Sequence, residues 1–260
     1  MNQVIADLAV LLDLAEGMLW AAALALVRVG AAVALMPALG ESAVPARVKM
    51  ALVLVLAAVV APFVADHVLS TGLQPALAPL LGEAIAGLIL GMGMRLFVLA
   101  LQTAASIIAQ ATTLSQLFAG VAPEPQPAIG NLLIIAGLAL ALAAGLHVRA
   151  AELLILSYDL MPAGGYPDPA RVADWGLGLI GSTFSLAFSL AAPFVIAATV
   201  YNLAIGAINR AMPQLMVSMV GAPALTLGGL ALLAIVSPAL LAVWLEAFSA
   251  HVAQPFRPAP

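Results

Sequence analysis

The amino-acid sequence predicts an all-α membrane protein built from several hydrophobic helices. Hydrophobic residues make up 65% of its 260 positions and charged residues only 8%, whereas soluble domains contain about 45–50% and about 25%. So few charges could not cover the surface of a water-soluble fold, so we expect lipid or apolar subunits around most of the chain. Backbone groups in apolar surroundings must form hydrogen bonds within their own segment, which favours helices over open strands.

Charges and prolines divide the chain into about six apolar blocks that could form membrane helices. The blocks are residues 18–36, 50–65, 84–117 with a break near Arg95, 128–146, 177–208 and 215–244. No fixed period repeats and no polar domain is appended, so we expect a single domain over residues 1–260. The first 17 residues carry three acidic and no basic side chains, unlike a signal peptide, so we expect this segment to be retained.

The first block carries Arg28 near its middle. Its seven Leu and Val residues favour insertion by about 0.3–0.6 kcal/mol each, whereas Arg at a helix centre costs about 2.5–3.5 kcal/mol. Because the two contributions nearly cancel, Arg28 needs either a protein partner or a helix end at which it snorkels to water. The last block has no charge and ten Leu, Ile or Val residues between 223 and 244, so we expect it to insert unaided.

Glu83, Gly87 and Gly91 recur every fourth residue at the start of the third block. Small residues let helices approach closely in an apolar medium, so the glycines predict a helix contact. A buried carboxylate is costly and should be paired or face water. Glu83 is therefore either a proton or ion site or, in the interpretation we favour, a residue near a helix end in a polar layer.

Further along this block, uncharged polar residues recur at spacings of 4, 4, 3 and 3 and occupy one arc of a helix. They are Gln102, Ser106, Gln110, Thr113 and Gln116. Such a stripe serves either interhelical hydrogen bonds or a water-filled lumen, and the pattern leaves both open. Three prolines follow in the run APEPQP, so residues 96–122 and 128–148 cannot be one helix and should form a hairpin.

A second polar patch consists of Asn202, Gly206 and Asn209 on one helix face, followed by Arg210. It is either a helix end with its cap or a docking surface.

The residue pattern points to neither catalysis nor a cofactor. The three His residues are far apart, and Cys is absent, which excludes disulfides and thiolate metal sites. The sequence has no GxSxG or HExxH motif, phosphate loop or dinucleotide fingerprint. The eight Lys and Arg are scattered, so nucleic acid is not an expected partner.

Four stretches resemble the FliR family of flagellar export proteins and its relatives in virulence systems. Residues 201–229, YNLAIGAINRAMPQLMVSMVGAPALTLGG, are similar to the family's C-terminal signature, and residues 28–52, RVGAAVALMPALGESAVPARVKMAL, to its N-terminal pattern. The residues from Glu83 to Gly91 match a third pattern, and those from His147 through SYDLMPAGG a fourth. The resemblance therefore covers almost the whole chain in order.

The resemblance implies a non-enzymatic subunit of a type III protein export gate, in the bacterial inner membrane at the flagellar basal body. Inclined helical hairpins of this subunit would assemble with FliP- and FliQ-type subunits, and with a FlhB-type switch subunit, into a closed cone that unfolded export substrates cross. The alternatives are a virulence injectisome homologue and, less favoured, a multi-pass secondary transporter. A transporter would need paired internal halves and a midplane ion site, and the sequence has neither.

The resemblance also assigns roles to residues, because the family's plug corresponds to residues 106–127. We expect the gate plug at Gln116, Leu117, Phe118, Ala119, Gly120 and Val121. We expect Gln102, Ser106, Gln110 and Thr113 to line the pore. We expect subunit contacts at Arg28, Gly87, Gly91, Asn202, Gly206, Asn209 and Arg210. Ala105 and Ala109 stand where the family has glycines, so helix is more favoured there than in the family.

Overall fold

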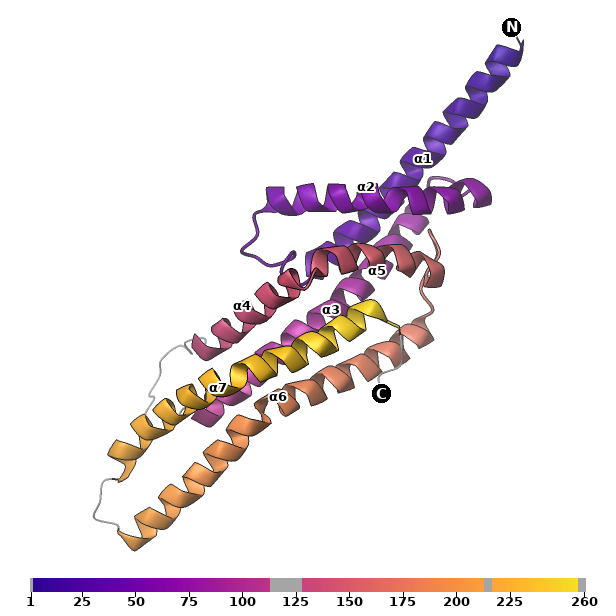
Figure 1. The fold of residues 1–260 in the computed structure, drawn as a ribbon. Helices are drawn as coiled ribbons and strands as arrows, with labels where there is room; N and C mark the ends of the chain where they lie inside the picture. Colours follow the sequence, from indigo (N-terminus) through magenta and orange to yellow (C-terminus); the bar gives the residue numbers. More distant parts are fainter. Residues whose placement is uncertain (1, 113–127, 213–216, 257–260) are drawn as a thin grey trace. The chain divides into compact units, whose positions relative to one another are not determined.

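The structure, a computed structural model, describes residues 2–112, 128–212 and 217–256. All regular elements in these ranges are helices (Figure 1). They are α1 (Asn2–Leu35), α2 (Ala46–Thr71), α3 (Leu77–Thr112), α4 (Ala128–Ala143), α5 (Leu146–Leu160), α6 (Pro169–Ala211) and α7 (Val217–Ala253). The predicted all-α fold is confirmed.

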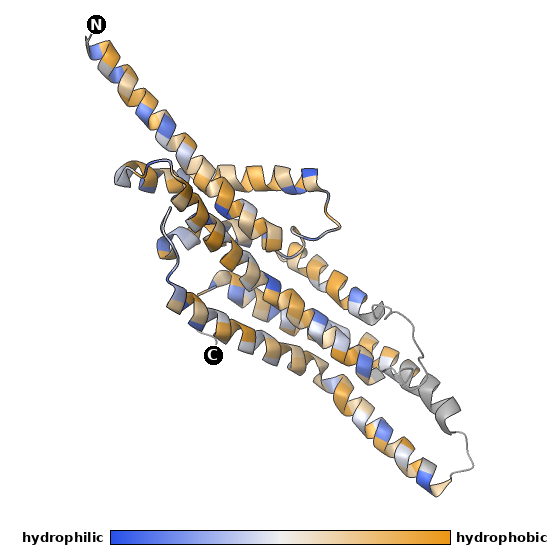
Figure 2. Cartoon of the chain, turned by 180° about the vertical axis from the view of Figure 1, so that it is seen from behind, coloured by the Kyte–Doolittle hydropathy of each residue, from blue (hydrophilic) through white to orange (hydrophobic). Residues whose placement is uncertain are grey.

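Five of these helices are long and apolar enough to cross a membrane: α1, α2, α3, α6 and α7. The bent pair α4–α5, whose halves meet at 69°, would make a sixth span if counted as one. Most residues along these helices are hydrophobic (Figure 2), and only 22% of the apolar 18-residue stretch of α2 is buried. The chain is therefore a hydrophobic membrane protein, as its composition predicts.

The contacts group the chain into two compact units, and the single domain expected from the sequence stays a prediction. Unit 1 comprises residues 1–96, 142–179 and 249–260, and unit 2 comprises residues 97–141 and 180–248. Helices α3, α6 and α7 therefore contribute to both units.

In unit 1, α1 packs against α2 and, more closely, against the first half of α3. A Cβ atom added to Gly87 would lie 2.2 Å from the Arg28 carbonyl oxygen, and one added to Gly91 would lie 2.5 Å from the Ala32 carbonyl oxygen. Real Cβ atoms do not come this close, so the backbone of α3 touches that of α1. The helix contact predicted from the two glycines exists, and it lies within the chain.

In unit 2, the second half of α3 runs antiparallel to α4. Leu101 lies beside Gly137, while Ala105 lies beside Gly130. Trp244 of α7 joins this core, since its indole N–H donates a 2.8 Å hydrogen bond to the Phe97 carbonyl. The antiparallel arrangement confirms the predicted hairpin for these segments, and the turn between them lies outside the described residues.

Two sequence expectations about helices are wrong. We expected a break near Arg95, but α3 continues through it, and the Arg95 guanidinium forms an ion pair with Glu41 from the α1–α2 connection. The charge is therefore matched by a distant carboxylate rather than by a break in the helix. Helix α5 was also missed, because His147, Arg149 and Glu152 interrupt its hydropathy. Its buried positions nevertheless recur at helical spacing: Leu146, Ala150, Leu153, Leu154 and Ser157.

Candidate functional site

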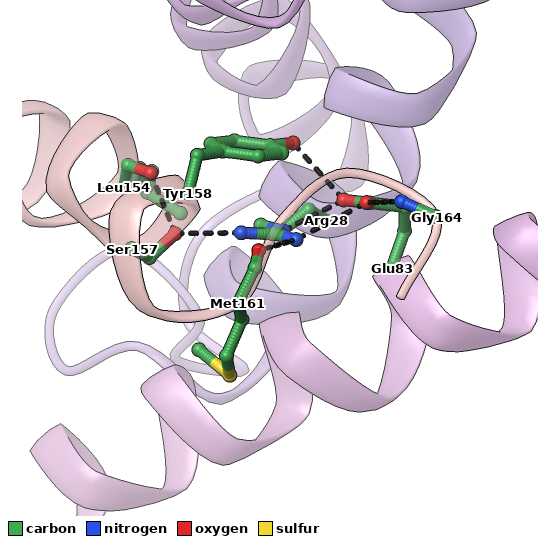
Figure 3. A network of polar contacts seen from close by, with 7 residues as sticks. All are labelled: Arg28, Glu83, Leu154, Ser157, Tyr158, Met161 and Gly164. Carbon is green, nitrogen blue, oxygen red and sulfur yellow. Dashed lines mark hydrogen bonds and ion pairs between the residues drawn. The ribbon is translucent and has the colours of Figure 1, made fainter. Parts of the chain in front are cut away.

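The most polar site inside unit 1 is built around Arg28 of α1, whose side chain is fully buried (Figure 3). Its Nε donates to Oε2 of Glu83 at 2.6 Å, and its Nη2 donates to Oε1 of the same carboxylate at 3.1 Å. Nη1 donates to Ser157 Oγ at 2.9 Å, and Nη2 also donates to the Met161 carbonyl at 2.8 Å. Four of the five N–H donors that a guanidinium offers are thus used by α3, α5 and the segment after α5.

The carboxylate of Glu83 is as well matched as the guanidinium. Besides the two bonds from Arg28, it accepts one from the Tyr158 hydroxyl at 3.0 Å and one from the Gly164 backbone N–H at 2.8 Å. A carboxylate has about four lone-pair positions, so these bonds use its accepting capacity. Glu83 therefore has no oxygen lone pair left for an ion, and the geometry is that of a structural ion pair.

Tyr158 contacts both charged partners. Its ring lies 3.5 Å from the Arg28 guanidinium carbon in a cation–π arrangement, while its hydroxyl bonds Glu83. Such contacts are strongest where water is excluded, and Arg28 and Glu83 are both 0% exposed. The ring therefore covers the ion pair as well as bonding it.

A local turn brings the Gly164 amide to Glu83. Gly164 has φ +73°, a left-handed conformation that glycine adopts without a side-chain clash, and the Gly165 N–H closes the turn on the Pro162 carbonyl at 3.1 Å. The turn lies tightly on α3, because a Cβ atom at Gly82 would lie 2.5 Å from the Gly165 oxygen. The run PAGG therefore fits a backbone approach that larger residues would block.

These contacts bear on three expectations. Of the two alternatives for Arg28, the structure shows a protein partner rather than a snorkelling helix end, and the partner is a carboxylate of the same chain. Glu83 lies near the start of α3, as expected, but it is buried and paired rather than held in a polar layer. The neighbours of Arg28, Gly87 and Gly91 in the described structure belong to this chain, and the subunit contacts expected at these residues stay a prediction.

The described part of the polar stripe lies in unit 2 on α3. Ser106 and Gln110 are exposed and Gln102 is partly exposed, whereas the other side of α3 is buried through Ala104, Ala105 and Ile108. Ser106 Oγ bonds the Gln102 carbonyl one turn back at 2.9 Å. The three described residues therefore face away from the core of the unit, as pore lining or a subunit contact requires. Thr113 lies outside the described residues, as do all the expected plug residues, Gln116, Leu117, Phe118, Ala119, Gly120 and Val121.

The C-terminal patch lies near the end of α6. Asn202 and Arg210 are exposed, and a Cβ atom at Gly206 would meet no atom within 4 Å. The side chain of Asn209 lies outside the described residues. The patch is part of an uninterrupted helix that continues to Ala211, so the alternative of a helix end applies only to Asn209 and Arg210.

Sequence reasoning missed an aromatic cluster in unit 1 around Trp175. The Trp175 indole N–H donates to the Pro255 carbonyl at 2.6 Å, and its ring stacks on His251 with centroids 6.3 Å apart. Gly93 of α3 faces both rings. The cluster holds the segment after α7 in place, and no local sequence pattern connects residues 80 positions apart.

The described residues contain no group of three or more His, Cys, Asp or Glu side chains that could hold a metal ion. The candidate sites predicted from the sequence are therefore, in the described residues, an internal ion-pair network and two exposed, mostly uncharged helix faces.

Comparison with known proteins gives a consistent result. Residues 19–251 match the family model described as bacterial export proteins, family 1. The chain is 32% identical over 233 residues to the flagellar biosynthetic protein FliR of Caulobacter vibrioides, an alignment that covers 88% of this chain and 93% of that protein. It is 29% identical over 216 residues to the flagellar biosynthetic protein FliR of Escherichia coli K12, covering 82% of each.

Proposed function

Because this chain belongs to the bacterial export proteins, family 1, and is a FliR-family subunit of the flagellar type III protein export gate, we propose that it forms part of the wall and plug of a closed protein-conducting pore. Its proposed partners are FliP- and FliQ-type subunits and a FlhB-type switch subunit. Its proposed cargo is unfolded flagellar proteins. The proposed location is the bacterial inner membrane at the basal body, and the subunit's role is structural rather than catalytic.

The observation that carries this proposal is the large apolar surface left uncovered by the chain itself. Helix α2 alone exposes seven large apolar side chains, from Val48 to Leu69. Glycine in a helix costs about 1 kcal/mol relative to alanine, and at Gly87 and Gly91 a close helix contact offsets that cost. Gly178 and Gly206 of α6 have no such neighbour within the described chain, which supports helices of other subunits there. We propose that Asn202, Gly206, Asn209 and Arg210 form one such contact.

The polar stripe supports a pore-lining role for α3. Gln102, Ser106 and Gln110 lie away from the core of unit 2, and they carry no charge that would retain a passing peptide. We propose that these residues, with Thr113, line the path of the cargo. A stripe that only joined helices within the chain would be buried against α4, whereas its described members are not.

We propose that residues 116–121, which follow the stripe in the sequence, form the plug. Bulky apolar groups close pores by excluding water, and Leu117 and Phe118 are of this kind. The prolines at 123, 125 and 127 restrict the following turn, so the plug moves as a unit.

Co-expression tests the proposed function. We expect the chain to be protease-sensitive when purified alone and to become protease-resistant when co-purified with FliP- and FliQ-type subunits of the same bacterium. The matched control is co-expression with an unrelated multi-pass membrane protein, which should give no protection. A monodisperse, thermally stable monomer in detergent would contradict the proposal and favour a self-contained transporter. Assembly with injectisome subunits and loss of injection rather than motility would indicate the virulence homologue.

A further inference from the structure

The first half of α1 is the least covered part of the described chain. It extends past α2 as a single helix (Figure 1), and its described side chains from Gln3 to Glu16 are all exposed. Six of its large apolar side chains are 57–70% exposed: Val4, Ile5, Leu8, Val10, Leu11 and Leu12. Gly17 is the first residue after this run that is not exposed, and the Leu69 side chain of α2 lies beside it.

Charge makes this segment unusual. Asp7, Asp13 and Glu16 are acidic, and no Lys or Arg precedes Arg28. Asp13 and Glu16 are three residues apart and therefore share one face of the helix. Asp7 is nine positions before Glu16, which at about 100° per residue places it on the opposite side.

The face that carries Glu16 also has the spacing of a helix-packing surface. Ile5, Ala9, Leu12 and Glu16 follow one another at intervals of 4, 3 and 4 residues, the pattern along which one helix packs on another. A helix lying on this face would meet apolar groups first and then the two carboxylates. At 1.5 Å per residue, the carboxylate of Glu16 lies about 17 Å along the axis from Ile5.

Four other surroundings do not suit this face. Water leaves the large apolar side chains exposed, while the hydrocarbon core makes two carboxylates costly. An anionic membrane surface attracts basic segments and repels acidic ones. A second copy of the chain packed in parallel through this face would place Asp13 and Glu16 against the same residues of its twin, and like charges across an interface destabilise it. In an antiparallel pair the carboxylates would lie against apolar residues and gain no basic partner.

We infer that the Ile5–Glu16 face of α1 docks an apolar helix of another gate subunit that carries Lys or Arg opposite Asp13 and Glu16. This inference rests on the proposed function, because it takes its partner from within the gate. Charge complementarity selects the partner, since a basic group on an otherwise apolar helix is the group that neutralises both carboxylates.

Charge reversal tests the inference in the full chain co-expressed with its gate subunits. The double variant Asp13→Lys/Glu16→Lys should reduce recovery of the other subunits at least ten-fold. The variant Asp7→Lys makes the same change on the opposite side and should stay within two-fold of the parent. The variant Asp13→Asn/Glu16→Gln, which keeps size and removes charge, should fall between the two. Recovery by the double variant equal to that of the parent would overturn the inference.

The charge-reversed double variant could fail to accumulate in the membrane for reasons of folding alone. A second measurement, the accessibility of single positions in α1 to a thiol reagent, tests the inference in that case. The chain has no cysteine, so a single introduced cysteine is the one thiol that a labelling reagent can modify, and its labelling rate measures the accessibility of that position. We expect a membrane-impermeant maleimide to label the Glu16→Cys variant at least ten-fold more slowly once the gate subunits are present, while labelling of the Asp7→Cys variant changes less than two-fold. Equal labelling of both variants in the assembled gate would show that the face meets water. Protection of Glu16→Cys in phosphatidylcholine vesicles without other subunits would show that it meets lipid, and either result overturns the inference.

The parent chain separates this inference from the proposed function. A parent that recovers no gate subunit contradicts the proposed function, and the inference falls with it. If the unmodified chain and the charge-reversed double variant both assemble normally with the gate subunits, the inference is contradicted and the proposed function is not.

Discussion

Arg28 and Glu83 lie 55 positions apart and meet in a two-bond ion pair, at 2.6 and 3.1 Å, with neither side chain exposed. Burying two charges costs desolvation that only good geometry and further hydrogen bonds offset. Tyr158, Ser157 and two backbone groups supply those bonds here (Figure 3). The pair therefore joins α1, α3 and α5 at one point, and losing either partner leaves the other charge buried and unmatched.

Replacing Arg28 alone should destabilise the subunit strongly. We expect Arg28→Met to cost about 3–5 kcal/mol, the usual effect of breaking a buried pair, and to lower both the amount of chain in the membrane and the melting temperature of the purified gate. Arg171→Met is the control, because the Arg171 side chain is 90% exposed and surface pairs contribute about 0–1 kcal/mol. The double variant Arg28→Met/Glu83→Met should lose less than the two single changes summed. Strict additivity, or an unaffected Arg28→Met gate, would argue against the network.

Adding one methyl group at Gly87 should disturb the α1–α3 contact. The Cβ of Gly87→Ala would lie 2.2 Å from the Arg28 carbonyl oxygen, so the helices must separate and the ion pair must stretch. We expect a lower melting temperature of the assembled gate. Gly181→Ala is matched in residue type but has open space around it in the described chain, so alanine's higher helix propensity, about 1 kcal/mol, should leave the fold intact. Equal effects of the two variants on chain level would count against the close contact.

A bulky residue at Gly206 should block assembly rather than folding of the chain. Gly206 lies on an exposed part of α6 with no atom of the described chain near its Cβ position. Gly206→Leu should therefore leave the amount of chain in the membrane unchanged but reduce co-purification of the other subunits and abolish motility, because the added side chain keeps the backbones apart. Gly206→Ala should have a smaller effect in the same direction. Normal assembly and motility of Gly206→Leu would remove this patch from the proposed interface.

Deleting residues 116–121 should open the gate without dismantling it. The proposed plug contributes Leu117 and Phe118, and a pore without its apolar constriction admits water and small ions. We expect the deletion-bearing gate to assemble, to raise ion conductance and to slow growth, with the parent gate as control. An assembled gate that stays as tight as the parent would place the seal in a partner subunit.

Local sequence properties predicted much of the architecture. The apolar blocks correspond to helices α1, α2, α3, α4, α6 and α7. In an apolar medium the backbone finds no hydrogen-bond partner outside its own segment, so each such block must form a helix. The glycine spacing in α3 also predicted a close helix contact. Hydropathy failed for α5, since its exposed side carries four charged or titratable residues: His147, Arg149, Glu152 and Asp159. Such a helix has a low average hydropathy and is recognised only by the helical spacing of its buried residues.

The candidate sites were predicted less completely, for a physical reason visible in Arg28. A lone cation is costly in an apolar helix, so the need for a partner follows from the residues around Arg28 alone. The partner is chosen by folding, however, since Glu83 is 55 positions away and Ser157 is 129 positions away. The same holds for Arg95, whose expected helix break is replaced by a contact with Glu41.

Composition, block length and ordered motifs were enough to identify an all-α membrane protein of the FliR family, because these properties of the chain do not depend on how distant segments meet. Only the folded chain shows which groups pair with its charged side chains. It also shows which glycine-containing helix faces already pack against another helix of the same chain. Gly87 and Gly91 pack within the chain, whereas Gly206 meets no described neighbour. Close approach of two helices depends on relative orientation, which local spacing does not encode, so the same small-residue pattern serves an internal contact in α3 and remains open in α6.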